Sequence, residues 1–177
     1  MSGERDDHRD IMIVLAAITD ESGYVKGNPY REIALYSDTP LSLVAQVLLD
    51  AFGFDSGKAF GFYSTVHGDY SRSEWHVDSL SPSIMKIPLA VIDDMDESQM
   101  LFVYDFEDEW RFLVKYINRM ESSEEIVCPA ILTRQGSAPD QYGPDTWDNP
   151  VEEVQNEHPV TDHGRFFIQK TLFDRWD

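Results

Sequence analysis

The sequence predicts an α+β fold: a mostly antiparallel sheet with one long amphipathic helix packed on it and a C-terminal helix. Three observations lead to this prediction. Most apolar segments have strand-like length, one segment has helical apolar spacing, and the strands follow one another instead of alternating with helices. With 177 residues, 42% of them hydrophobic, the chain is long enough to fold around one core.

The composition indicates a reducing compartment. Cys128 is the only cysteine in the sequence, so an internal disulfide is impossible. The first ten residues lack the apolar run of a signal peptide, and no stretch reaches the roughly 18 apolar residues of a membrane span. We therefore expect a soluble cytoplasmic protein without membrane contact, with a flexible N-terminal arm over residues 1–10 and a single domain over residues 11–177.

Three segments in the N-terminal half are typical of strands. Residues 11–18 form a continuous apolar run, which indicates a buried strand. Residues 30–36 alternate between apolar and polar, and residues 59–66 are rich in aromatic and β-branched side chains. Residues 67–83 are polar and predict a loop. Residues 84–92 are apolar but interrupted by a proline, so their secondary structure stays open.

The long helix is predicted between the second and third strands. Thr39 is a suitable N-cap, Pro40 a suitable first helical residue, and Gly53 a suitable C-terminal stop. The apolar positions between them recur at helical spacing and define one buried face. They are Leu41, Val44, Leu48 and Phe52.

A β-hairpin and the remaining elements follow. Residues 100–104 and 109–117 predict two strands joined by a turn over residues 105–108, with Phe112 on one face of the second strand and Arg111 and Leu113 on the other. Residues 126–132 predict a further strand, and Pro129 favours a sheet edge for it. Apolar side chains spaced four residues apart within residues 165–176 predict the terminal helix.

The charge is strongly negative and unevenly distributed. Thirty-three acidic and 14 basic residues give a net charge of −19, which repels a nucleic-acid backbone, so we expect no nucleic-acid partner. Residues 93–109 hold eight carboxylates and no base. Such a run is usually a solvated face, but it also fits a cation site, a basic protein partner or mimicry of nucleic acid.

The common catalytic motifs are missing. The sequence contains no G-x-x-x-x-G-K-[ST], G-x-G-x-x-G, H-E-x-x-H, G-x-S-x-G or paired C-x-x-C, so no cofactor is predicted. Asp105 and Asp108 in the hairpin turn have oxygen ligands suited to a hard cation. Aspartates also hydrogen-bond turns, and because the spacing of a calcium loop is missing, we favour that structural role.

Five segments, taken in order, resemble the motifs of one family. The segment Y-D-F-E-D-E-W at residues 104–110 resembles the Y-D-F-G-D-x-W signature of the plasmid pRiA4b ORF-3-like family. The other four are P-Y-R-E-I at residues 29–33, the T-P-L to A-F-G-F-D stretch at 39–55, A-F-G-F at 59–62 and G-S-A-P-D-Q-Y-G at 136–143.

The resemblance covers about residues 11–150 and implies an α+β domain of bacteria and archaea, often near mobile elements, without an established biochemical role. The chain departs from the family pattern at two histidine positions, where it has Ala59 or its neighbours and Phe112. Glu107 also replaces the turn glycine, so a positive φ at that residue would be strained.

The hypothesis that follows is a non-enzymatic interaction module with an unidentified protein partner of basic character. One alternative is a metal-assisted hydrolase, in which carboxylates hold a divalent ion that activates water. A second alternative is a DNA mimic that binds a basic protein. The candidate functional or structural residues are Arg31, Tyr104, Asp105, Phe106, Asp108, Trp110, Pro139 and Asp140. No metal site is predicted; the carboxylates that the hydrolase would use are Asp105, Asp108, Glu109 and Asp140, with Asp105, Asp108 and Asp140 as the metal candidates.

Overall fold

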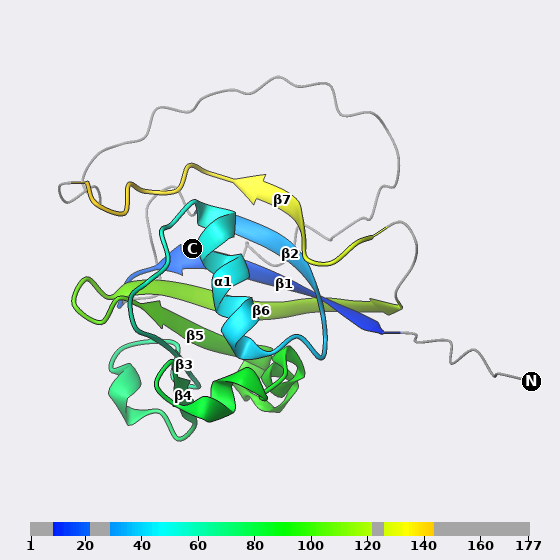
Figure 1. Cartoon of the computed structure of the whole chain (residues 1–177), viewed down its shortest axis with the longest axis horizontal. Helices are drawn as coiled ribbons and strands as arrows, with labels where there is room; N and C mark the ends of the chain where they lie inside the picture. Colours follow the sequence, from blue (N-terminus) through cyan, green and yellow to red (C-terminus); the bar gives the residue numbers. More distant parts are fainter. Residues whose placement is uncertain (1–8, 22–28, 122–125, 144–177) are drawn as a thin grey trace, which may run out of the picture.

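Seven antiparallel strands form one sheet in the computed structural model, which describes residues 9–21, 29–121 and 126–143 (Figure 1). The spatial order is β4-β3-β5-β6-β1-β2-β7. The long strands β1 and β6 pair with each other at the centre, while β4 and β7 form the two edges. The strands are β1 (Asp10–Thr19), β2 (Tyr30–Tyr36), β3 (Phe60–Tyr63), β4 (His76–Asp78), β5 (Gln99–Tyr104), β6 (Trp110–Glu121) and β7 (Ala130–Gln135).

One α-helix, α1 (Leu41–Phe52), lies across one face of the sheet (Figure 1). The four residues predicted for its buried face, Leu41, Val44, Leu48 and Phe52, are all at most 5% exposed. The helix begins one residue later than predicted, with Pro40 instead of Thr39 at the N-cap position, and Gly53 ends it in the left-handed conformation at φ 73°. No helix in the described part of the chain is long and apolar enough to cross a membrane.

The predicted fold class is wrong. The described residues form mostly antiparallel sheet with one ordinary helix of 12 residues, about 18 Å long, instead of a long helix on a sheet and a second, C-terminal helix. The predicted helix at residues 165–176 lies outside the described residues. The segment at residues 84–92, whose secondary structure the sequence left open, belongs to a series of short 3₁₀ turns over residues 82–98, because Pro88 within it and Pro82 before it lack backbone donors. These turns are η2 (Pro82–Met85), η3 (Leu89–Asp94) and η4 (Asp96–Ser98).

The main core lies between α1 and the sheet. Alternation along the strands sends one set of side chains toward the helix, among them Val14 of β1 and Phe112 of β6, both 0% exposed. The ring of Phe112 contacts the rings of Phe52 and Phe54 at centroid distances of 5.3 and 5.6 Å. These aromatic contacts join the C-terminal end of α1 to the central strand β6.

The opposite face of the sheet has its own smaller cluster. Tyr63, Leu101 and Val103 point to this face from β3 and β5 and pack with Val66. The segment after β3, predicted as a loop, contains the turn η1 (Tyr70–Arg72) and the short strand β4. Arg111 belongs to this face too, because it alternates with Phe112 on β6.

Candidate functional site

Asp105 is the structural centre of the hairpin turn between β5 and β6. Its backbone N–H donates to the Ala59 carbonyl at 2.9 Å, and its carbonyl accepts from the Glu109 N–H at 2.6 Å. The buried carboxylate accepts from the Glu107 N–H at 3.2 Å through Oδ1 and lies 3.3 Å from Lys58 Nζ through Oδ2. The hydrogen bond to Asp105 raises the pKa of Lys58. Both carboxylate oxygens of Asp105 therefore already have partners that hold the turn.

The backbone of the turn is strained at its two ends. Asp105 and Glu109 adopt left-handed conformations with φ of 55° and 51°. Glu107, where the family signature has glycine, does not have a positive φ, so the strain considered for that residue is not present. Aspartate tolerates the left-handed region better than most residues, whereas glutamate has a Cβ and a longer side chain that disfavour it.

Tyr104 connects the base of the hairpin to two neighbouring loops. Its hydroxyl donates to the Asp55 carbonyl at 2.6 Å and accepts from the Lys58 N–H at 3.3 Å. The Asp55 N–H in turn donates to Gln141 Oε1 at 2.7 Å. The loop at residues 136–143 is thus joined to the hairpin through Asp55.

Arg31, another family-motif residue, has a structural role. It is 5% exposed and extends from β2 to the end of α1, where Nε donates to the Ala51 carbonyl at 3.1 Å. Nη1 donates to the carbonyls of Tyr30, Gln135 and Gly136 at 2.8, 2.9 and 3.2 Å. Burial, followed by the nearby charge of Arg134, lowers the pKa of Arg31.

The other candidate residues lie at different places in the structure and do not form one site. Trp110 is buried against Phe54 in an edge-to-face contact at 4.8 Å, while Phe106 and Asp108 are exposed at the hairpin tip. Pro139 is half-buried and Asp140 is exposed; Asp140 Oδ1 accepts from the Tyr142 N–H at 3.0 Å. Within residues 9–21, 29–121 and 126–143, no three His, Cys, Asp or Glu side chains are grouped to hold a metal ion.

The acidic run of residues 93–109 is divided into two groups by strand β5. Asp93, Asp94, Asp96 and Glu97 precede β5, and Glu107, Asp108 and Glu109 follow it. A six-residue strand separates its ends by roughly 17–20 Å, so the two groups lie more than a Debye length apart at physiological salt. Asp93 also pairs with Arg119 of β6, and Lys58 lies 4.0 Å from Glu107.

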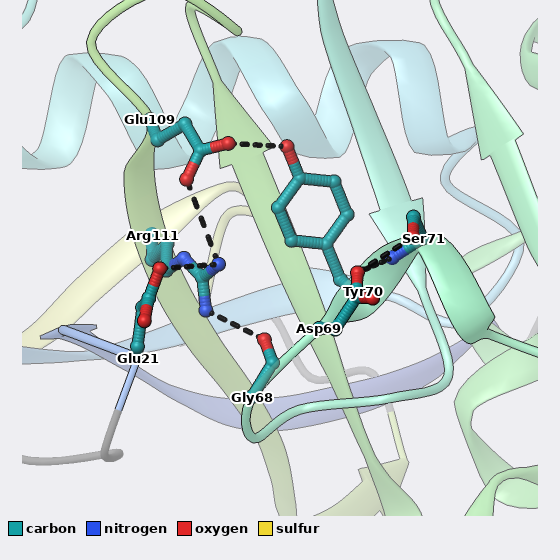
Figure 2. A pocket seen from close by; sticks show the side chains of 7 residues that line it. All are labelled: Glu21, Gly68, Asp69, Tyr70, Ser71, Glu109 and Arg111. Atoms are coloured by element: carbon teal, nitrogen blue, oxygen red, sulfur yellow. Dashed lines mark hydrogen bonds and ion pairs between the residues drawn. The ribbon is translucent and has the colours of Figure 1, made fainter.

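A cavity of about 300 Å³ lies beside the hairpin, on the sheet face opposite α1 (Figure 2). Arg111, 5% exposed, reaches into it from β6, and its Nη1 donates to the Gly68 carbonyl at 3.0 Å. Its Nη2 lies 3.6 Å from Glu109 Oε2 and 3.9 Å from Glu21 Oε1. The lining consists of Glu21, Gly68, Asp69, Tyr70, Ser71, Glu109 and Arg111.

Tyr70 forms a fixed aromatic wall of this cavity. The Arg111 guanidinium lies 5.0 Å from its ring centroid, and its hydroxyl donates to Glu109 Oε1 at 3.0 Å (Figure 2). Burial, and then the hydrogen bond to Glu109, raise the pKa of Tyr70 to about 12. Tyr63 contacts the Tyr70 ring at 4.6 Å and itself lies over Gly61, where a Cβ would be 2.8 Å from the Tyr63 hydroxyl.

The motif analysis did not identify this cavity. Glu21 follows β1, Tyr70 lies in the turn η1 and Arg111 lies at the start of β6, so no local spacing relates them. One signal was present: the alternation of the predicted hairpin placed Arg111 beside the apolar Leu113, on the face opposite Phe112. A cation at such a position requires partners from elsewhere in the fold.

Comparison with known proteins supports the fold and the family. A solved structure of a protein of unknown function from Methanosarcina mazei Go1 is similar, with a TM-score of 0.60 and 11% identity over 76% of this chain and 74% of that chain. At this identity the likeness shows the fold alone. Comparison with curated proteins finds no match. The model of the plasmid pRiA4b ORF-3-like protein family matches residues 24–176, which extends beyond the segments of the sequence resemblance. This match covers most of the chain, which therefore belongs to the plasmid pRiA4b ORF-3-like family.

Proposed function

We propose that the protein is a non-enzymatic binding module whose hairpin and adjoining cavity contact a basic protein partner. The observation that carries this proposal is the gathering of carboxylates at one end of the sheet. Glu109 belongs both to the hairpin and to the cavity lining, so the two features form one surface. The other carboxylates of this surface are Glu21, Asp69, Glu107 and Asp108, all exposed.

The rigidity of the hairpin also supports this proposal. Asp105 and Glu109 are held at opposite ends of the turn, the first by Lys58 and Ala59 and the second by Tyr70 and Arg111. A preorganised surface loses less conformational entropy on binding than a mobile loop. The net charge of −19 would accelerate encounter with a basic partner and make it sensitive to salt.

A labelled lysine- and arginine-rich peptide tests the proposal by fluorescence anisotropy. We expect the wild-type protein to bind it at low salt and to lose affinity as sodium chloride is added. The double variant Glu107→Gln/Asp108→Asn should bind about tenfold more weakly, because two carboxylates of the contact surface lose their charge.

The matched control is Asp94→Asn/Asp96→Asn, which removes the same charge at the other end of β5, from exposed side chains. We expect it to weaken binding much less than the hairpin variant. Failure of the wild-type protein to bind at low salt would contradict the proposed function. An equal loss in both double variants would instead show that the peptide senses net charge and not this surface.

A further inference from the structure

The charges that line the cavity are unbalanced. Asp69 pairs with Arg72 at 3.1 Å and accepts from Ser71, so its charge is compensated nearby. Glu21 and Glu109 share Arg111, which is the one cation among the described residues that line the cavity. Two carboxylates against one guanidinium leave an excess of negative charge where a ligand would enter.

The two carboxylates have capacity for a further donor. Their distances to Arg111 Nη2, 3.9 and 3.6 Å, are ion-pair distances and exceed a hydrogen bond. A carboxylate offers about four lone-pair sites, and the Glu21 side chain is 80% exposed. A second cationic group can therefore approach Glu21 without removing it from Arg111.

The cavity already surrounds one guanidinium group, that of Arg111, with the kinds of contact that a second cationic side chain would need. Arg111 is contacted by a tyrosine ring, a backbone carbonyl and two carboxylates. The ring of Tyr70 is fixed by Tyr63 and by Glu109, so the wall does not need to be ordered on binding. An anion would be repelled by the excess negative charge of Glu21 and Glu109, whereas a cation is attracted by it.

We propose that the cavity receives a single lysine or arginine side chain of the basic partner, with Glu21 and Glu109 as its carboxylate contacts. This inference rests on the function proposed above and identifies the ligand group that the cavity takes. A volume of about 300 Å³ accommodates one long side chain but no larger structural element.

The probes are N-acetyl-argininamide and its uncharged isostere N-acetyl-citrullinamide, titrated into the full chain and followed by NMR chemical shifts. We expect the arginine compound to bind, and the citrulline compound to bind at least tenfold more weakly, because it lacks the charge. Glu21→Gln should weaken arginine binding about three- to fivefold, at the upper end of what an exposed charge pair contributes. The control Asp94→Asn removes the same charge from another exposed site and should leave the affinity within twofold.

The outcomes separate this inference from the proposed function. If the basic peptide binds in a salt-dependent manner but Glu21→Gln and Asp94→Asn have equal effects on the arginine probe, the cavity inference is wrong and the hairpin surface remains. Equal binding of the arginine and citrulline compounds would also overturn it. If neither the peptide nor the arginine probe binds, both proposals fail. Because the Glu21 side chain is exposed, its substitution does not threaten folding.

Discussion

Arg31 Nε donates a hydrogen bond to the carbonyl oxygen of Ala51, 3.1 Å away, and so connects strand β2 to the C-terminal end of α1. The last carbonyls of a helix have no partner within it and carry the negative end of its dipole. A buried guanidinium is suited to this place because it satisfies several carbonyls at once. Arg31 also lies over the ring of Phe52 at 4.6 Å.

Arg31→Met should lower the free energy of unfolding by about 2–4 kcal/mol, because it leaves several carbonyls without a charged donor while retaining the apolar stem. Urea denaturation measures this difference. The control is Arg134→Met: Arg134 is exposed and donates to the same Ala51 carbonyl at 3.1 Å, so its loss should cost less than about 1 kcal/mol. Equal effects of the two substitutions would contradict the structural role of Arg31.

Leu48→Ala should lower the free energy of unfolding by about 2–5 kcal/mol, because Leu48 is 0% exposed between α1 and the sheet and its truncation leaves a cavity. Leu43 lies on the same helix but is 48% exposed, and Leu43→Ala should change stability by less than about 1 kcal/mol. Thermal or urea denaturation of the two variants checks the difference. A denaturation midpoint of Leu48→Ala equal to that of the wild-type protein would show that this helix face is not packed as described.

Tyr70 should make stability fall at alkaline pH. Its folded-state pKa of about 12 exceeds the ordinary tyrosine value of 10.0, so the unfolded chain releases this proton first as pH rises. Unfolding is therefore coupled to proton release, and this contribution to stability is complete below about pH 10 and lost by about pH 12. Tyr70→Phe removes this titrating group, so the free energy of unfolding should decline less steeply with pH in this variant, as measured by urea denaturation from pH 9 upward.

The raised pKa values of Tyr30 and Tyr63 act in the same direction and remain in both proteins. Identical slopes would mean that the Tyr70 hydroxyl is not buried against Glu109.

Strands in which apolar and polar side chains alternate could be predicted from the sequence alone. The predicted strand at residues 30–36 coincides with β2, and the alternation of the hairpin placed Phe112 and Arg111 on opposite faces, as observed. These features depend on side-chain periodicity, which is visible within one segment. The role of Asp105 in holding the turn was likewise predicted locally, because aspartate side chains often accept a backbone hydrogen bond two residues further on.

Features that depend on contacts between distant segments could not be predicted. Strand β4 has three residues, too few for a pattern, and forms because it pairs with β3. The cavity requires Gly68 and Tyr70 to fold back over β6, where Arg111 supplies their partner. The type of the segment at residues 84–92, which the sequence left open, also depends on its surroundings: its apolar side chains pack, but Pro88 within it and Pro82 before it limit it to short turns.

Calcium and magnesium should stabilise the protein no more than sodium at equal ionic strength. Asp105, the buried carboxylate of the turn, already contacts Lys58 Nζ and the Glu107 N–H, and a metal ion there would be repelled by the positive charge of Lys58. Asp108 is exposed at the tip, and β5 separates it from the acidic group that begins at Asp93. Screening of repulsion among these exposed carboxylates should raise stability modestly with any salt.

Thermal melts in calcium, magnesium and sodium chloride at matched ionic strength check this prediction. A divalent ion that binds the folded state selectively would raise stability by about 1.4 kcal/mol for each tenfold increase in its concentration above the dissociation constant. Asp108→Asn is the diagnostic variant, because it removes one carboxylate without disturbing the contacts of Asp105. A calcium-specific rise that disappears in this variant would contradict the prediction. It would mean that the hairpin rearranges on binding, since calcium needs several oxygen ligands and no three carboxylates are grouped among the described residues.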